Sequence, residues 1–185
     1  LGYTATAGSP SQYSLDFNAA AQAQGFADIV NAALPATPIV VTIPGAAIAG
    51  TYNATLTVLN TVTGCVSTSQ PVTVTINNTP TITLGANPTI CEGDVAAPLP
   101  YSATTATPNQ YSINFDAAAE AEGFVDVVNA ALGASPISIT VPGAAGAGVY
   151  NATLRVRNSG STCQSTPQPI SVTINALPSI AGIVV

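Results

Sequence analysis

The sequence is poor in charge and lacks several residue types altogether. Its 185 residues include no histidine, methionine or tryptophan, and the only two cations, both arginines, stand against eight acids. Two cations cannot neutralise a run of phosphates, which excludes nucleic-acid binding. Without histidine and lysine, most general bases, imidazole metal ligands and Schiff-base chemistry are also missing. We therefore expect no enzymatic activity.

Long hydrophobic runs are absent as well. Hydrophobic residues make up 47% of the chain and the mean hydropathy is +0.43, yet proline, glycine, asparagine and threonine interrupt every apolar stretch before it reaches 18 residues. No membrane span is expected in this segment. The opening Leu1–Thr4 carries no basic region, so no signal peptide is expected either. The composition indicates a folded, acidic, threonine-rich exterior protein.

The sequence is built as a repeat. When it is shifted by 98 residues without a gap, 49 of the 87 aligned pairs are identical. A period of this length is domain-sized, so each copy is expected to fold as its own unit. We assign residues 1–79 to a first repeat truncated at its N-terminus, 80–177 to a second repeat and 178–185 to the start of a further one. The first copy has no counterpart of Asn87–Pro98.

Short alternating segments in the second copy predict strands, and one alanine-rich segment predicts a helix. Asp116–Gly123 has an N-cap residue, a run of alanines and a glycine stop. Phe124–Leu132 fits either an extension of that helix or a strand. The expected strands are 81–84, 89–91, 100–104, 110–115, 137–141, 149–156 and 170–174. Short strands separated by proline, glycine and asparagine turns predict an all-β, immunoglobulin-like β-sandwich with one short helix in each copy.

Two tyrosines stand where such sandwiches place a tyrosine corner. Tyr52 and Tyr150 each follow a glycine by two positions at the start of a long strand. In a tyrosine corner the hydroxyl of this residue donates a hydrogen bond to the backbone upstream. We expect a structural role for both.

Between Pro108 and Cys163 the second copy contains Pro-Asn-Gln-Tyr-Ser-Ile-Asn-Phe-Asp, Glu-Gly-Phe-Val-Asp and Gly-Val-Tyr-Asn-Ala-Thr-Leu. Both copies resemble the PKD-like, immunoglobulin-fold repeats of giant secreted surface adhesins of flavobacterium-like bacteria, including gliding-motility adhesins. The resemblance implies an extracellular, cell-surface adhesin or filament of many tandem domains, exported by the type IX route. Phe17 and Phe115 depart from it, because many members have tryptophan at that position.

The three cysteines leave alternatives open. In an oxidising exterior, a Cys91–Cys163 disulfide would clip the first strand of the second copy to the region before its last strand. Cys65, the counterpart of Cys163, would then be unpaired or paired outside this sequence. The alternatives are free thiols throughout and a Cys65–Cys91 bridge between the copies.

Acidic residues offer weak candidates for a metal site. Glu92 and Asp94 stand close together and could contribute oxygens to Ca²⁺. Asp116, Glu120 and Glu122 cluster on the predicted helix, but the first copy has asparagine and glutamine at those positions. A metal site that needed these charges could not exist in both copies. We therefore expect the acids of the helix to be solvated surface groups, and we expect no cofactor.

The leading hypothesis is a non-catalytic structural repeat in the stalk or filament of an extracellular adhesin, whose partners are neighbouring repeats and like chains. The alternatives are a subunit of a self-assembling extracellular fibre and, with less support, a carbohydrate-binding module, since such modules often use exposed aromatic residues and aromatics here are 5%. In the stalk hypothesis the last strand of each unit lies beside its own first strand. Tension would then be carried by backbone hydrogen bonds loaded in shear.

Overall fold

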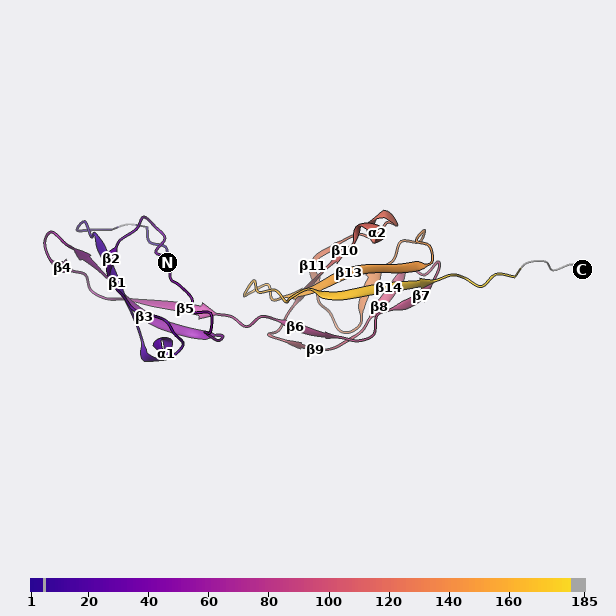
Figure 1. Ribbon diagram of the computed structural model, residues 1–185, viewed down its shortest axis with the longest axis horizontal. Coiled ribbons are helices and arrows are strands. Elements are labelled where there is room, and N and C mark those ends of the chain that lie inside the picture. The colour runs from indigo at the N-terminus through magenta and orange to yellow at the C-terminus, as the bar shows by residue number, and fades with distance from the viewer. Residues whose placement is uncertain (5, 181–185) are drawn as a thin grey trace, which may run out of the picture. The chain divides into compact units, whose positions relative to one another are not determined.

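A computed structural model describes residues 1–4 and 6–180 (Figure 1). The chain divides into two compact units, Leu1–Asn78 and Thr79–Val185, called unit 1 and unit 2. Each unit consists of strands and one short helix, which confirms the predicted all-β sandwich. No helix among the described residues is long and apolar enough to cross a membrane.

Unit 2 is the fuller sandwich. Its larger sheet has the strand order β11-β10-β13-β14-β7, and β8 with β12 and β6 with β9 form two smaller ladders. In chain order its elements are β6 (Thr81–Leu84), β7 (Thr89–Cys91), β8 (Ala96–Leu99), β9 (Tyr101–Thr105), β10 (Gln110–Phe115), α2 (Ala117–Ala121), β11 (Val127–Ala131), β12 (Ile137–Thr140), β13 (Gly148–Arg157) and β14 (Gln168–Asn175).

The core of unit 2 lies between the larger sheet and the two ladders. Alternate residues of β13 and β14 face inward, as the period-two pattern predicts, and they are almost fully buried. They meet side chains from the first strands of the unit, including Ile82, Ala97 and Leu99, and from β12. The sandwich is therefore closed by the strands that precede β10 in the chain together with β12.

Unit 1 repeats the larger sheet of unit 2. Its strands follow the order β2-β1-β3-β4, with β5 paired to β3. The elements are β1 (Gln12–Phe17), α1 (Ala19–Gln22), β2 (Ile29–Ala33), β3 (Gly50–Asn60), β4 (Cys65–Val66) and β5 (Gln70–Ile76). Unit 1 begins at the position of Leu99 in the repeat, so its described residues include no counterparts of β6 and β7.

The short helix forms where the sequence predicts it. The Asp116 carboxylate accepts the Ala119 N–H at 2.8 Å, and the Asn18 amide oxygen accepts the Ala21 N–H at 3.0 Å in unit 1. Gly123 ends the helix region with φ +94°, a conformation that side chains disfavour. A charged aspartate and a neutral asparagine thus cap the same helix turn in the two units.

An aromatic cluster packs beneath each helix. The rings of Phe115, Phe124 and Tyr150 pack in tilted pairs with centroids 4.9 and 4.8 Å apart, and the corresponding rings of unit 1 have the same spacings. Phe115 is thus a core residue of unit 2, as Phe17 is in unit 1.

The structure confirms most expected strands, decides the open alternative after Phe124 and adds one strand. The segment after Phe124 does not extend the helix, because Val127–Ala131 forms β11 and pairs antiparallel with β10. β8 was not predicted; its residues Ala96–Leu99 pair with β12. Two alanines and a proline have little intrinsic strand preference, so pairing and burial decide this segment.

Candidate functional site

The second and last strands of unit 2, β7 and β14, lie side by side. β7 runs parallel to β14, with Thr89 opposite Thr173 and Cys91 opposite Asn175 (Figure 1). We call the two segments Pro88–Glu92 and Thr173–Leu177 the terminal clamp. The clamp brings an early strand of the unit next to its last strand. Among the described residues, no cluster of side chains suited to catalysis or metal binding offers a better candidate site.

Backbone hydrogen bonds extend the clamp beyond the three paired positions. The Thr173 N–H donates to the Pro88 carbonyl at 3.0 Å, and the Glu92 N–H donates to the Asn175 carbonyl at 2.9 Å. Ile90, at the centre of β7, is 9% exposed and belongs to the core. The clamp therefore combines directed hydrogen bonds with burial of an apolar side chain.

Glu92 fastens the clamp through its side chain. One carboxylate oxygen accepts the Ala147 N–H at 2.8 Å, and the other accepts the Leu177 N–H at 3.2 Å. Hydrogen bonds to an ionised acceptor are stronger than neutral ones. A single carboxylate thus ties the end of β7 to the loop before β13 and to the chain after β14.

Asp94 has a local role at the same end. Its carboxylate accepts the Cys91 N–H at 2.9 Å across a turn in which Gly93 has φ +90°. The described residues contain no group of three or more histidine, cysteine, aspartate or glutamate side chains placed to hold a metal ion. The hydrogen bonds of Glu92 and Asp94 account for these acids as parts of the protein framework.

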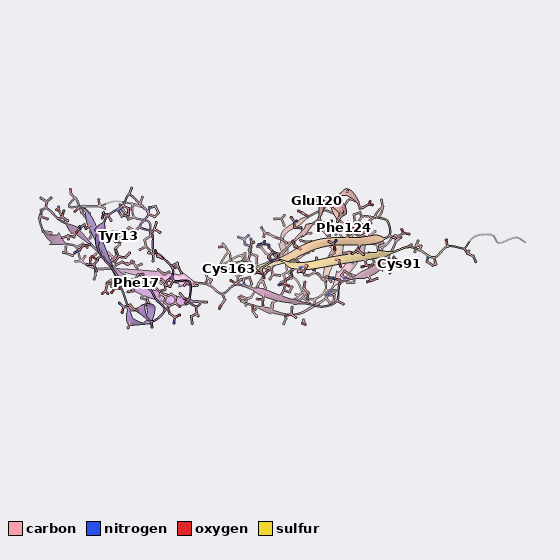
Figure 2. All side chains as sticks on the ribbon, in the orientation of Figure 1. Tyr13, Phe17, Cys91, Glu120, Phe124 and Cys163 are labelled. Atoms are coloured by element: carbon pink, nitrogen blue, oxygen red, sulfur yellow. The ribbon has the colours of Figure 1, made fainter. Side chains whose placement is uncertain are left out.

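The predicted Cys91–Cys163 disulfide is wrong. All three cysteine thiols, including that of Cys65, are free. Figure 2 shows Cys91 and Cys163 at opposite ends of unit 2. Cys91 ends β7 beside Asn175. The Cys163 carbonyl instead accepts the Asn158 N–H, just past the far end of β13.

The length of β13 explains the separation of these thiols. About ten residues of strand at roughly 3.3 Å each lie between the two cysteines. A disulfide requires Cα atoms within about 7 Å. β14 begins after the loop that contains Cys163 and runs antiparallel to β13 until it ends beside Cys91. The prediction failed because the two cysteines therefore lie at opposite ends of these strands.

Both tyrosines make the hydrogen bond of a tyrosine corner. The Tyr52 hydroxyl donates to the Ile48 carbonyl at 2.7 Å, and the Tyr150 hydroxyl donates to the Gly146 carbonyl at 2.8 Å. Burial raises the pKa of Tyr150 above its ordinary value, and the carboxylates of Glu122 and Glu92 raise this pKa further. Tyr150 therefore stays protonated as a donor at neutral pH.

The remaining acids near the helix also have structural partners or face solvent. The Asp126 carboxylate accepts the Phe115 N–H at 2.8 Å, and Asp28 does the same for Phe17 in unit 1. Glu120 is exposed on α2. The two aspartates shared by the copies are thus explained by a backbone hydrogen bond at the end of a strand.

Aromatic side chains do not form an exposed binding platform. All ten phenylalanine and tyrosine residues lie in the described part of the chain, and each is buried or half-buried. Stacking of a sugar on a β-sandwich needs an exposed ring face, which these residues do not offer.

Comparison with known proteins adds no family. No protein-family model matches the chain, and a search of curated proteins finds no match.

Proposed function

We propose that this chain is a load-bearing structural repeat, part of the stalk or filament of an extracellular bacterial surface adhesin of the gliding-motility type. The terminal clamp is the observation that carries this proposal. Two parallel strands tied to opposite ends of a unit are pulled in opposite directions when the chain is stretched. Their hydrogen bonds are then loaded together, which resists force better than opening them one at a time.

The path of the chain through unit 2 has the geometry that shear requires. The chain enters unit 2 at β6, where Thr81 lies opposite Thr105. The next residues, Ala106 and Thr107, accept hydrogen bonds from the Asn158 side chain with their carbonyls, so the chain enters at the end of β13 where Asn158 lies. It leaves after Asn175, beside Cys91 at the other end of β14. Tension between these ends runs along β7 and β14.

The repeated sequence and the scarcity of charge support the same function. A tandem stalk needs units that fold alike, and both copies use the same helix, aromatic cluster and tyrosine hydrogen bond. Location at the cell surface and type IX export belong to the proposal through the family resemblance. Antibodies against this chain should label intact, unpermeabilised cells, and labelling only after permeabilisation would refute this location.

Single-molecule pulling on a polyprotein that contains the chain tests the mechanical role. The 98-residue repeat 80–177 of unit 2 should extend to roughly 320–350 Å less its folded length. Because the thiols are free, reductant should not change this step. Glu92→Gln, which weakens the bonds to Ala147 and Leu177, should lower the unfolding force.

Glu120→Gln is the matched control, because it removes the same charge from an exposed helix position. It should leave the unfolding force unchanged. A wild-type unit 2 that unfolds without measurable resistance, or equal forces for wild type and Glu92→Gln, would contradict the load-bearing function.

A further inference from the structure

Unit 1 has an open apolar face at the place where unit 2 is covered. The repeat pairs Leu1 with Leu99, so the residues of unit 1 have no counterpart of the nineteen residues Pro80–Pro98 ahead of them. That segment supplies β6, β7 and most of β8 in unit 2. The strands that both units have are paired in the same register, with Gly50 opposite Ile76 and Gly148 opposite Ile174. The two units therefore form a matched pair that differs by one segment.

The inward-facing side chains report this difference directly. Leu154 and Val156 of β13 are 0% exposed, whereas their counterparts Leu56 and Val58 in β3 are only half-buried. The last strand shows the same contrast along its whole length. Three residues of β14 are at most 3% exposed and their counterparts in β5 are half-buried, namely Ile170, Val172 and Ile174 against Val72, Val74 and Ile76.

The edge of β5 is also open. In unit 2 the corresponding edge of β14 is occupied by β7, and the Thr173 N–H donates to Pro88. Thr75 is the counterpart of Thr173, and within the described residues of unit 1 the strand β5 pairs with β3 alone. An unpaired strand edge beside apolar side chains is a template for a further strand.

Leu1 fixes where such a strand would run. Its N–H donates to the Ile39 carbonyl at 2.6 Å, and its carbonyl accepts the Ile39 N–H at 2.8 Å. Leu99 and Ile137 occupy the same paired positions in unit 2. Leu1 thus holds the last position of the strand equivalent to β8, and a segment ahead of it would continue along residues 40–42.

Ile43 shows what the missing segment would cover. Ile43 is 47% exposed, whereas its counterpart Val141 is 3% exposed and donates its N–H to the Val95 carbonyl at 3.0 Å. Val95 belongs to the segment that unit 1 lacks. One backbone contact and one buried side chain are therefore absent at the same place.

A hollow of about 300 Å³ opens on this face of unit 1. No charged residue lines it, and the lining includes Tyr3, Leu34, Ile39, Leu56 and Val58. In unit 2 the core on this side includes Ile82 of β6. The hollow thus suits apolar side chains of an extended peptide rather than an ionic ligand.

We infer that unit 1 is an acceptor for one strand-forming peptide segment, equivalent to Pro80–Pro98, that docks directly ahead of Leu1. The segment pairs in parallel with β5, pairs antiparallel with residues 39–42 and places an isoleucine in the hollow. Attachment at Leu1 makes docking intramolecular, so the segment occupies the face at high effective concentration. Unit 1 can accept this strand whether or not the chain bears load.

The direct test adds a copy of Pro80–Pro98, with serine in place of its cysteine, ahead of Leu1 in the full chain. Amide hydrogen exchange of Thr75 is the readout, because this N–H should gain the acceptor that Pro88 provides to Thr173. We expect exchange at Thr75 to slow at least tenfold. Exchange at Thr173 in unit 2 serves as the internal reference and should not change.

A second extended chain carries Ile82→Asp and Ile90→Asp in the added segment only. It should leave Thr75 exchanging as fast as in the chain without an extension. Equal exchange at Thr75 with and without the intact extension, while Thr173 stays protected, would overturn the inference.

Sedimentation of the unextended chain tests the competing occupant. The inference expects a monomer whose Thr75 exchange does not depend on protein concentration. Self-association accompanied by concentration-dependent protection of Thr75 would show that a second copy covers β5, and would also overturn it.

Discussion

Replacing Thr173 by proline removes one backbone donor from the terminal clamp. The Thr173 N–H points toward β7 and donates to the Pro88 carbonyl at 3.0 Å. Proline has no N–H and is tolerated in sheets at open edges but not between paired strands. Thr173→Pro should therefore destabilise unit 2.

The size of the effect follows from the contacts that depend on this bond. Loss of the hydrogen bond, with the Pro88 carbonyl left unsatisfied, costs about 1–3 kcal/mol. If β7 detaches, the burial of Ile90 is lost as well, which adds about 1.5–3 kcal/mol. We expect the free energy of unfolding of unit 2 to fall by about 1–3 kcal/mol if β7 stays in place, and by about 2.5–6 kcal/mol if it detaches.

Thr75→Pro is the matched control in the same chain. Thr75 occupies the corresponding position of β5, whose outer edge has no strand partner among the described residues. Any strain that proline imposes on the strand itself is common to both variants. Thr75→Pro should cost under about 1 kcal/mol, as is usual for a substitution that removes no contact.

Urea denaturation followed by amide signals of each unit separates the two effects. Thr173→Pro should shift the midpoint of the unit 2 signals and leave those of unit 1 in place. Equal losses for the two variants in their respective units would refute the reasoning, because the cost would then come from the strand and not from its pairing with β7.

Two further predictions concern the helix region of unit 2. Asp116→Ala should cost about 1 kcal/mol of unfolding free energy because it removes the N-cap acceptor, whereas Asp116→Asn should be nearly neutral, as Asn18 caps the equivalent helix; urea titration checks both. Gly123→Ala should cost about 1–3 kcal/mol, because φ is +94° and a side chain is strained there. Gly143→Ala, where a Cβ meets no atom within 4 Å, is the control and should lie within about 0.5 kcal/mol of wild type in thermal unfolding.

Local patterns in the sequence were sufficient to predict most of the fold. The helix in unit 2 is specified by its cap at Asp116, its alanines and Gly123, all of which act within one turn or two. Strands with strict alternation, such as Ile170–Ile174, were predicted because one face of each is buried. These signals do not depend on distant parts of the chain.

Features that depend on tertiary pairing were not predictable in the same way. β8 contains two alanines and a proline, and it becomes a strand only because β12 lies beside it. Val127–Ala131 has apolar residues that suit a helix, yet the edge of β10 draws it into the sheet. Spacing along the chain likewise could not reveal that Cys91 and Cys163 lie at opposite ends of unit 2.

The segment Pro80–Pro98 explains both the terminal clamp and the open face of unit 1. In unit 2 it supplies β7, and the open face of unit 1 lies where it would pack. The repeat alignment alone could not reveal which surface the segment Pro80–Pro98 covers in unit 2. That surface became visible only when Val72 and Val74 could be compared with their buried counterparts in β14. Unit 1 therefore serves as an internal control for what the first strands contribute to the stability of unit 2.

Tyr150 provides a prediction for stability against pH. Its hydroxyl must keep its proton to donate to the Gly146 carbonyl, and burial, with the charges of Glu122 and Glu92, raises its pKa in the folded protein. As pH rises past about 10, the ordinary tyrosine pKa, the unfolded chain loses this proton first. The stabilisation is thus complete at neutral pH and is lost as pH rises from about 10 through the folded-state pKa.

Tyr150→Phe isolates this contribution, since the other tyrosines titrate in both proteins and cancel in the difference. At pH 7 the variant should be less stable by about 1 kcal/mol, the usual net value of one hydrogen bond. Above pH 10 the gap between wild type and variant should shrink. Urea denaturation of unit 2 from pH 7 to 11 measures this gap. A gap that stays constant over that range would mean that the Tyr150 hydroxyl titrates alike in the folded and unfolded chains, and that its burial does not favour the protonated form.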